Sequence, residues 1–189
     1  MRYLTRSSGR RLAALLRHTG GASAVEFALV ALPFFMVLTA VFEAGLVTLA
    51  QQGLDNGLDR AARTLFTGTF QTNSDGTPAA NRFRAEMCPA VVYIDCSQIK
   101  VEVTTGSTFA SSSPTSPYNS STRTANSSFG SKFQCPSANN IVTVRAVATV
   151  PRYFKFLTLN GLQLAAGGQM VVSTLVFRAE PYPSGSCGS

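Results

Sequence analysis

The sequence is poor in charge and in the side chains that enzymes use most for acid–base chemistry. Only 13% of its 189 residues are charged, whereas soluble domains average about a quarter. It has no Trp and a single His, His18. The acids are scattered, and no glycine-rich phosphate loop follows a strand pattern. We therefore expect no enzyme, no cofactor and no metal site, and the hydrophobic content of 45% indicates that part of the chain lies outside water.

Positive charge is concentrated at the N-terminus. The chain holds 16 Lys and Arg against 9 Asp and Glu, a net charge of +7. Five of these cations lie in the first twenty residues, which contain no acid: Arg2, Arg6, Arg10, Arg11 and Arg17. The rest of the chain is close to neutral, with no basic face that could follow a phosphate backbone. We therefore expect no nucleic-acid partner and assign residues 1–21 as a basic cytoplasmic leader.

A long apolar run follows this leader. Between Phe27 and Phe42 no residue is charged and only Thr39 is polar. Crossing a bilayer takes about twenty mostly apolar residues, so we place the span at residues 27–47, with Glu43 near an interface. A buried core helix or a cleaved secretory signal is the alternative, but the run is longer than a signal's apolar region. The basic leader predicts a cytoplasmic N-terminus and an extracytoplasmic remainder.

Glu26 is an acid at the start of the apolar run, where a carboxylate is costly without a partner. It could lie at the interface without a role. However, a basic leader, a Gly, four small or apolar residues, an acid, an aromatic and an apolar helix form the arrangement of type IV prepilins. The version G-x-x-x-x-E-[Y/F] resembles the TadE-like pseudopilins of the tight-adherence (Tad/Flp) pilus assembly system. The resemblance continues through AVEFALVALPFFMVLTAVFEAGLVTLAQQGLDNGLDRAAR.

The resemblance implies a processing site and an assembly residue. In that family a membrane aspartic peptidase cuts after the Gly, which puts the cut between Gly21 and Ala22 and makes Glu26 the fifth mature residue. The new α-amino group, largely cationic at neutral pH, would neutralise the Glu of a neighbouring subunit and set the subunit register. Phe27 stands where the family more often has Tyr. Cleavage would also remove His18.

The function that the resemblance implies is that of a minor pseudopilin, a pilus assembly protein of a Tad-type, type IVb-like pilus. Its partners would be a prepilin peptidase, other pseudopilins, the major pilin and an inner-membrane assembly platform, with surface attachment or secretion as the outcome. It would be a single-pass protein of the bacterial cytoplasmic membrane. The alternative is an unprocessed membrane-anchored binding module with a periplasmic or extracellular head. Cleavage at Gly21 separates the two.

The remaining sequence predicts an α+β fold. Leu54, Leu58 and Leu65 recur at helical spacing, so we expect the membrane helix to continue unbroken and to stop at Gly68. A transmembrane helix at 22–50 would thus lead into an extracytoplasmic α+β domain at 51–189, in which the helix packs on a small antiparallel sheet.

Patterns of Pro, Val, Ile and Thr predict the elements of that domain. Thr77 and Pro78 indicate the N-cap and first turn of a short helix that ends at about Cys88. Four segments read as strands: Ala90–Ile94, Gln98–Thr105, Asn140–Val150 and Gln169–Ala179. The aromatic segment 153–159 is of uncertain type and could form one helical turn over the sheet.

Three glycines lie along the predicted helix: Gly45, Gly53 and Gly57. The spacing Gly53-x-x-x-Gly57 allows close helix approach, or these positions simply avoid large side chains under the domain. Pro33 removes a backbone donor and could kink the span.

A Ser/Thr-rich loop is predicted at 105–140. Its first part is so rich in Ser and Thr that it should not order itself firmly. We interpret it as a surface loop that meets a partner or carries glycans, or as a tolerated insertion.

The four cysteines all fall on the extracytoplasmic side, where disulfides are favoured over metal ligands. They are Cys88, Cys96, Cys135 and Cys187. Three pairings are possible. Closeness in the chain favours Cys88 with Cys96 and Cys135 with Cys187.

Overall fold

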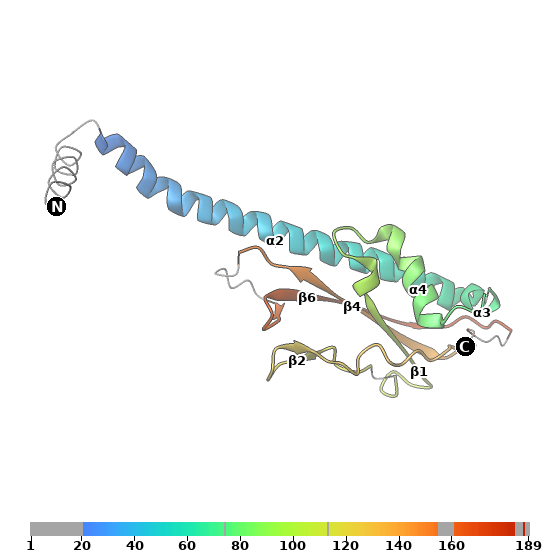
Figure 1. Cartoon of the computed structure of the whole chain (residues 1–189). Helices are drawn as coiled ribbons and strands as arrows, with labels where there is room; N and C mark the ends of the chain where they lie inside the picture. The colour runs from blue at the N-terminus through green and yellow to red at the C-terminus, as the bar shows by residue number, and fades with distance from the viewer. Residues whose placement is uncertain (1–20, 74, 113, 155–160, 184–186, 188–189) are drawn as a thin grey trace, which may run out of the picture. The chain divides into compact units, whose positions relative to one another are not determined.

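The computed structural model describes residues 21–73, 75–112, 114–154, 161–183 and 187 (Figure 1). The chain divides into two compact units, Met1–Val41 and Phe42–Ser189. The leader with His18, and residues 155–159 of the aromatic segment, lie outside the described residues. The fold is α+β, a long apolar helix and a small antiparallel sheet, which confirms the predicted class.

Helix α2 covers Ala22–Thr67 and contributes to both units. It runs through Pro33 without a break in its assignment. It ends where predicted, because Gly68 adopts the left-handed conformation, with φ of 80°, that terminates helices. A single further turn, α3 (Thr69–Thr72), follows directly.

The second unit is built on a four-stranded antiparallel sheet in the order β1-β4-β6-β5. The strands are β1 (Lys100–Gly106), β4 (Ile141–Pro151), β5 (Leu162–Gln163) and β6 (Gly168–Arg178). The two long strands, β4 and β6, pair along their whole length from Ile141↔Arg178 to Pro151↔Gly168. These strands match three of the four segments predicted from the Val, Ile and Thr pattern.

One face of the sheet packs against the C-terminal part of α2 and against α4 (Ala79–Met87), as Figure 1 shows. Alternate residues of β4 point to this face, which is the side-chain period of a strand. Together with the buried helix residues they form the main core. Its fully buried members include Leu54, Leu58, Ala61, Leu65, Phe83, Met87, Val103, Val142, Val144, Ala146 and Val150. The predicted packing of the helix on a small sheet is therefore present in this unit.

The opposite face of the sheet is covered by the Ser/Thr-rich segment, with its two-stranded ladder of β2 (Tyr118–Asn119) and β3 (Thr124–Ala125). A second small core of Phe129, Val147 and Met170 lies there. The segment is fastened mainly by hydrogen bonds, among them one between the hydroxyls of Ser112 and Thr143 at 2.9 Å. In the segment that was expected to order itself only weakly, polar anchors take the place of the missing hydrophobic side chains.

Two local predictions are also wrong. Ala90–Ile94 is not a strand: the 3-10 turn η2 (Cys88–Ala90) leads into a bend in which Tyr93 has φ of 68°. A left-handed residue between two bridged cysteines turns the chain, and the Val91 side chain packs against α2 at Gly57 instead. Thr77 is not the N-cap of α4. That position is taken by Pro78, which makes no side-chain cap, while Asp75 accepts a hydrogen bond from the Thr77 amide at 2.9 Å.

Candidate membrane-anchor and assembly site

The predicted processing residues lie at the beginning of α2. Ala22 is the first residue of the helix, directly after the predicted cut. Gly21 is exposed, and a Cβ at this position would meet no atom within 4 Å. Within the part of the chain that the structure describes, no side chain crowds the position of Gly21.

Glu26 and Phe27 lie on the exposed surface of the same helix. Phe27 has 73% of its surface exposed, and Glu26 is exposed as well. Among the described residues, no hydrogen bond or ion pair reaches the Glu26 carboxylate. The chain itself thus offers this acid no described partner, in keeping with a partner on another molecule.

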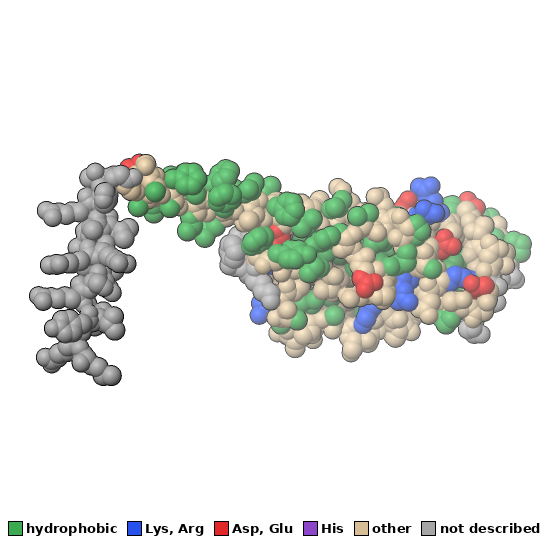
Figure 2. Space-filling model, turned by 45° about the horizontal axis from the view of Figure 1, so that its top comes forward, with side chains coloured by type: hydrophobic (Ala, Val, Ile, Leu, Met, Phe, Trp, Pro, Cys, Tyr) green, Lys and Arg blue, Asp and Glu red, His purple; other side chains and the backbone are tan. Residues whose placement is uncertain are grey.

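The helix around these residues is apolar and uncovered. Figure 2 shows hydrophobic side chains gathered around it. The large ones exposed by more than 45% are Val25, Phe27, Leu29, Val30, Leu32, Phe34, Phe35, Met36, Val37, Leu38, Val41 and Phe42. Between Phe27 and Phe42 the one polar residue is Thr39, whose hydroxyl donates to the carbonyls of Phe35 and Met36 at 2.9 and 3.0 Å. By length and composition α2 can cross a membrane between Ser23 and Thr67.

Glu43, which the sequence analysis expects near a membrane interface, lies in a buried ion pair of the second unit. Its side chain is only 2% exposed and accepts a hydrogen bond from Arg152 Nε at 3.1 Å, in an ion pair that is buried on both sides. The backbone amide of Phe154 donates to the other carboxylate oxygen at 3.2 Å. The acid therefore belongs to the second unit, where it fastens the chain that leaves β4 onto α2. The sequence alone did not identify Arg152 as the partner of Glu43. The one sequence feature that marks Arg152 is its place as a cation directly after a strand and a Pro.

Two tyrosines lie beside this ion pair. The Tyr93 hydroxyl donates to the Tyr153 hydroxyl at 3.1 Å. This hydrogen bond, with burial and the negative charge of Glu43, raises the pKa of Tyr93 to about 12. The bend at Tyr93 and the end of β4 are thus joined on the same side of α2.

The three predicted packing glycines have different surroundings. A Cβ at Gly45 would meet nothing within 4 Å. At Gly53 it would meet the Val92 amide at 3.0 Å, and at Gly57 the Val91 side chain at 2.9 Å and the Met87 carbonyl at 3.1 Å. Gly53 and Gly57 therefore leave room for the chain that follows α4 in the same molecule. This is the interpretation in which the glycines avoid large side chains under the domain.

The cysteines form two disulfides, Cys88–Cys96 and Cys135–Cys187. This is the pairing that closeness in the chain favours. The first closes the bend after α4, and the second ties residue 187 to the last part of the Ser/Thr-rich loop.

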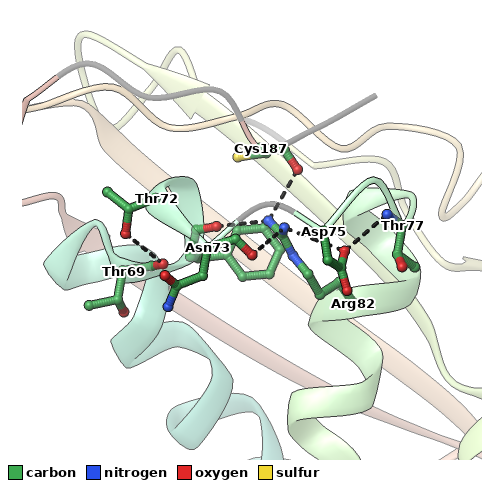
Figure 3. Close-up of polar contacts among 8 residues, drawn as sticks. Thr69, Thr72, Asn73, Asp75, Thr77, Arg82 and Cys187 are labelled. Carbon is green, nitrogen blue, oxygen red and sulfur yellow. Dashed lines mark hydrogen bonds and ion pairs between the residues drawn. The ribbon is translucent and has the colours of Figure 1, made fainter.

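Near α3, Arg82 forms hydrogen bonds with several chain segments of the second unit (Figure 3). Its guanidinium donates to the carbonyls of Asn73 at 2.9 Å, Phe70 at 2.7 Å and Cys187 at 3.1 Å. It also lies 4.0 Å from the centre of the Phe70 ring. Its guanidinium also lies 3.9 Å from the Asp75 carboxylate. Because all these partners belong to the chain itself, we assign Arg82 a structural role.

The comparisons with known proteins agree with this picture of the N-terminal segment. The family model described as TadE-like protein matches residues 21–63. The match starts at the Gly of the predicted cut and confirms the resemblance to that family over this segment. No curated protein and no solved structure matches the chain.

Proposed function

We propose that this chain, whose residues 21–63 match the TadE-like family, is a minor pseudopilin that helps to assemble a Tad-type pilus. The observation that carries the proposal is the coincidence of three features within the matched segment. They are a Gly at an open position before the helix, an acid without a described partner, and an uncovered apolar helix surface.

In this proposal a prepilin peptidase removes the leader after Gly21. The amine of Ala22 then pairs with Glu26 of a neighbouring subunit, since an unpaired carboxylate among apolar side chains is costly. The exposed apolar surface of α2 faces lipid before assembly and other pseudopilins or the major pilin afterwards. The leader stays on the cytoplasmic side and the second unit, with both disulfides, lies outside the cytoplasmic membrane.

The role that we propose for the second unit is structural and not enzymatic. Two of its arginines hold the fold together. Arg152 forms an ion pair with Glu43, and Arg82 donates hydrogen bonds to three backbone carbonyls. Surface attachment and secretion are the outcomes that we assign to the assembled pilus, with an inner-membrane platform as the assembly partner.

The test is intact mass measurement and N-terminal sequencing of the protein purified from its own membrane. We expect a mature N-terminus at Ala22 and a mass gain on reduction that corresponds to two disulfides. A chain that starts at Met1 or Arg2 would contradict processing and leave a plain membrane anchor.

Two matched glycine variants sharpen this test. Gly21→Leu should block cleavage, and Gly20→Leu should leave the cut after Gly21. A Cβ at Gly21 meets no atom within 4 Å, so a loss of cleavage in Gly21→Leu reflects recognition by the peptidase and not misfolding.

The register role of Glu26 needs a separate variant. Glu26→Ala should spare processing more than assembly, because the acid lies beyond the scissile bond. Unaltered piliation by the Glu26→Ala chain would contradict a role in subunit register.

A further inference from the structure

The two edge regions of the sheet, at β1 and at β6, differ in how their outward backbone groups are hydrogen-bonded. The outer edge of β1 is covered by the chain at residues 132–134. The Val103 amide donates to the Lys132 carbonyl at 3.1 Å, and the Gln134 amide donates to the Val103 carbonyl at 2.9 Å. The Thr105 amide donates to the Gln134 side chain at 2.7 Å. The Val103 amide and carbonyl and the Thr105 amide therefore have partners.

The outer edge of β6 is covered at its beginning and again just past its end, where the Glu180 amide donates to the Phe66 carbonyl at 3.1 Å. β5 pairs with β6 at Gln169 and Met170 alone. The Leu164 amide donates to the Gly168 carbonyl at 2.8 Å, and Gln51 Nε2 donates to the Val172 carbonyl at 3.0 Å. These contacts show that the even-numbered residues of β6 turn their backbone groups away from β4, since bonding alternates along an antiparallel strand.

Beyond Val172 this edge is open. Thr174, Val176 and Arg178 continue the outward series, and within the described part of the chain no hydrogen bond reaches the backbone groups of Thr174 or Val176 from that side. The Val176 side chain is 46% exposed. Natural sheets block exposed edges because they template strand addition. Among the described residues, the middle of the β6 edge at Thr174 and Val176 has no such block.

An apolar hollow lies beside the open edge. It has a volume of about 230 Å³ and is lined by Asp59, Ala62, Arg63, Phe66, Leu175 and Phe177. The last two belong to β6 and face α2, so the hollow lies between the helix and the strand. A strand added to β6 would place every second side chain over this hollow.

We propose that the open edge of β6 binds an extended segment of another envelope protein, which adds to the sheet as a fifth strand. Thr174, Val176 and Arg178 supply the backbone hydrogen bonds, and the hollow at Phe66 and Phe177 takes apolar side chains of the segment. The exposed cation of Arg178 at the end of the edge favours an acidic residue at that end of the segment.

A second copy joined through its own β6 edge is not the occupant. Gln51 lies at Val172, whereas Phe66 accepts a hydrogen bond from the Glu180 amide at 3.1 Å, so α2 and β6 run in the same direction. Two copies that joined β6 edges about a two-fold axis would pair them antiparallel. Their α2 helices would then run in opposite directions, which is incompatible with two anchors in one membrane. This step rests on the proposed membrane anchor.

The experiment uses the full chain in its own host, with a photoreactive benzoylphenylalanine in place of Val176. We expect a light-dependent product with another envelope protein, whose crosslinked peptide is an extended, mainly apolar segment. The matched control carries the same residue in place of Ser131, an exposed position in the chain after the small core on the opposite face, and should give no such product. A third chain carries it in place of Phe27 and reports assembly through α2.

A backbone variant tests the strand geometry. With the photoreactive residue at Thr174, Val176→Pro removes one outward amide and should weaken the product about tenfold. Val176→Thr keeps the amide and should retain it. Edge strands tolerate Pro, and an unchanged Gly21 cut with both disulfides intact verifies that the Pro variant is folded.

Each result decides between the proposals. A product at Val176 that joins two copies of this chain overturns the assigned partner. A product from Phe27 without one from Val176 overturns the strand site and leaves the proposed function standing. An uncleaved chain without product at either position overturns both.

Discussion

The two faces of the sheet are covered by chain segments of opposite composition. On one face, α2 and α4 bury Leu54, Leu58 and Phe83 against the strands. On the other face, a segment rich in Ser and Thr is held by hydrogen bonds to Glu102, whose side chain is fully buried. The first face is stabilised by apolar area, the second by specific polar contacts. The comparison shows that a chain too polar to form its own core can still be ordered by a few buried anchors.

The clearest polar anchor on the helical face is the ion pair of Glu43 and Arg152. Arg152→Met should leave Glu43 as an uncompensated buried charge and lower the free energy of unfolding by about 3–5 kcal/mol. Urea unfolding of the full chain in detergent, followed by circular dichroism, measures this. The double variant Glu43→Gln/Arg152→Met should recover part of the loss. A single variant as stable as the parent would show that the pair adds nothing to the helical face.

Apolar packing on the same face predicts the next largest effect. Leu58 is 1% exposed, and Leu58→Ala should cost about 3 kcal/mol through lost burial and the cavity left behind. Phe109, with 72% exposure, provides the control, because Phe109→Ala should change the unfolding free energy little. An equal loss of unfolding free energy in the two variants would show that burial of the hydrophobic side chain does not decide the effect.

The opposite face should respond to the loss of one charge. Glu102 accepts hydrogen bonds from the amides of Thr115 at 2.7 Å and Gly130 at 3.1 Å. In Glu102→Gln the side-chain amide nitrogen would face one of these donors, at a cost of about 2 kcal/mol. Hydrogen exchange of the Thr115 and Gly130 amides should rise in this variant and stay unchanged in the exposed control Glu86→Gln. Protection of both amides in Glu102→Gln would refute the anchor.

The smallest effect is the pH dependence of this anchor. Burial raises the pKa of Glu102, but the hydrogen bonds from Thr115 and Gly130 and the charge of Lys132 outweigh it and hold the pKa below its ordinary value of 4.5. The ionised form therefore stabilises the fold above pH 4.5, and this contribution is lost as the pH falls through the lower, folded-state pKa. The difference in unfolding free energy between the parent and Glu102→Gln should shrink in that range. A constant difference would exclude the titration of Glu102 as its cause.

The helical face was largely predictable from the sequence. The spacing of Leu54, Leu58 and Leu65 marks the buried stripe, and alternation marks β4 and β6, because apolar periodicity reports burial directly. The stop at Gly68 was predictable for a similarly local reason, the left-handed conformation that Gly adopts easily.

The opposite face and the polar contacts were not predictable in this way. No local pattern predicts the contacts of Glu102 with Thr115 and Gly130, or of Glu43 with Arg152, because these partners are far apart in the chain. The overall composition does not identify such pairs either. The candidate site was predictable to the extent that it consists of a contiguous pattern around Gly21 and Glu26. The open edge of β6 depends on how many strands the sheet has, which periodicity does not report.

The buried ion pair of Glu43 and Arg152 also sets a length. Because Glu43 is held inside the second unit, the helix that remains for a bilayer runs from Ala22 to Phe42. At a rise of about 1.5 Å per residue this stretch measures about 32 Å, close to the hydrocarbon thickness of about 30 Å. For a chain inserted as proposed, the ion pair acts as a depth stop, and the match makes the anchor sensitive to hydrophobic mismatch in thinner or thicker membranes.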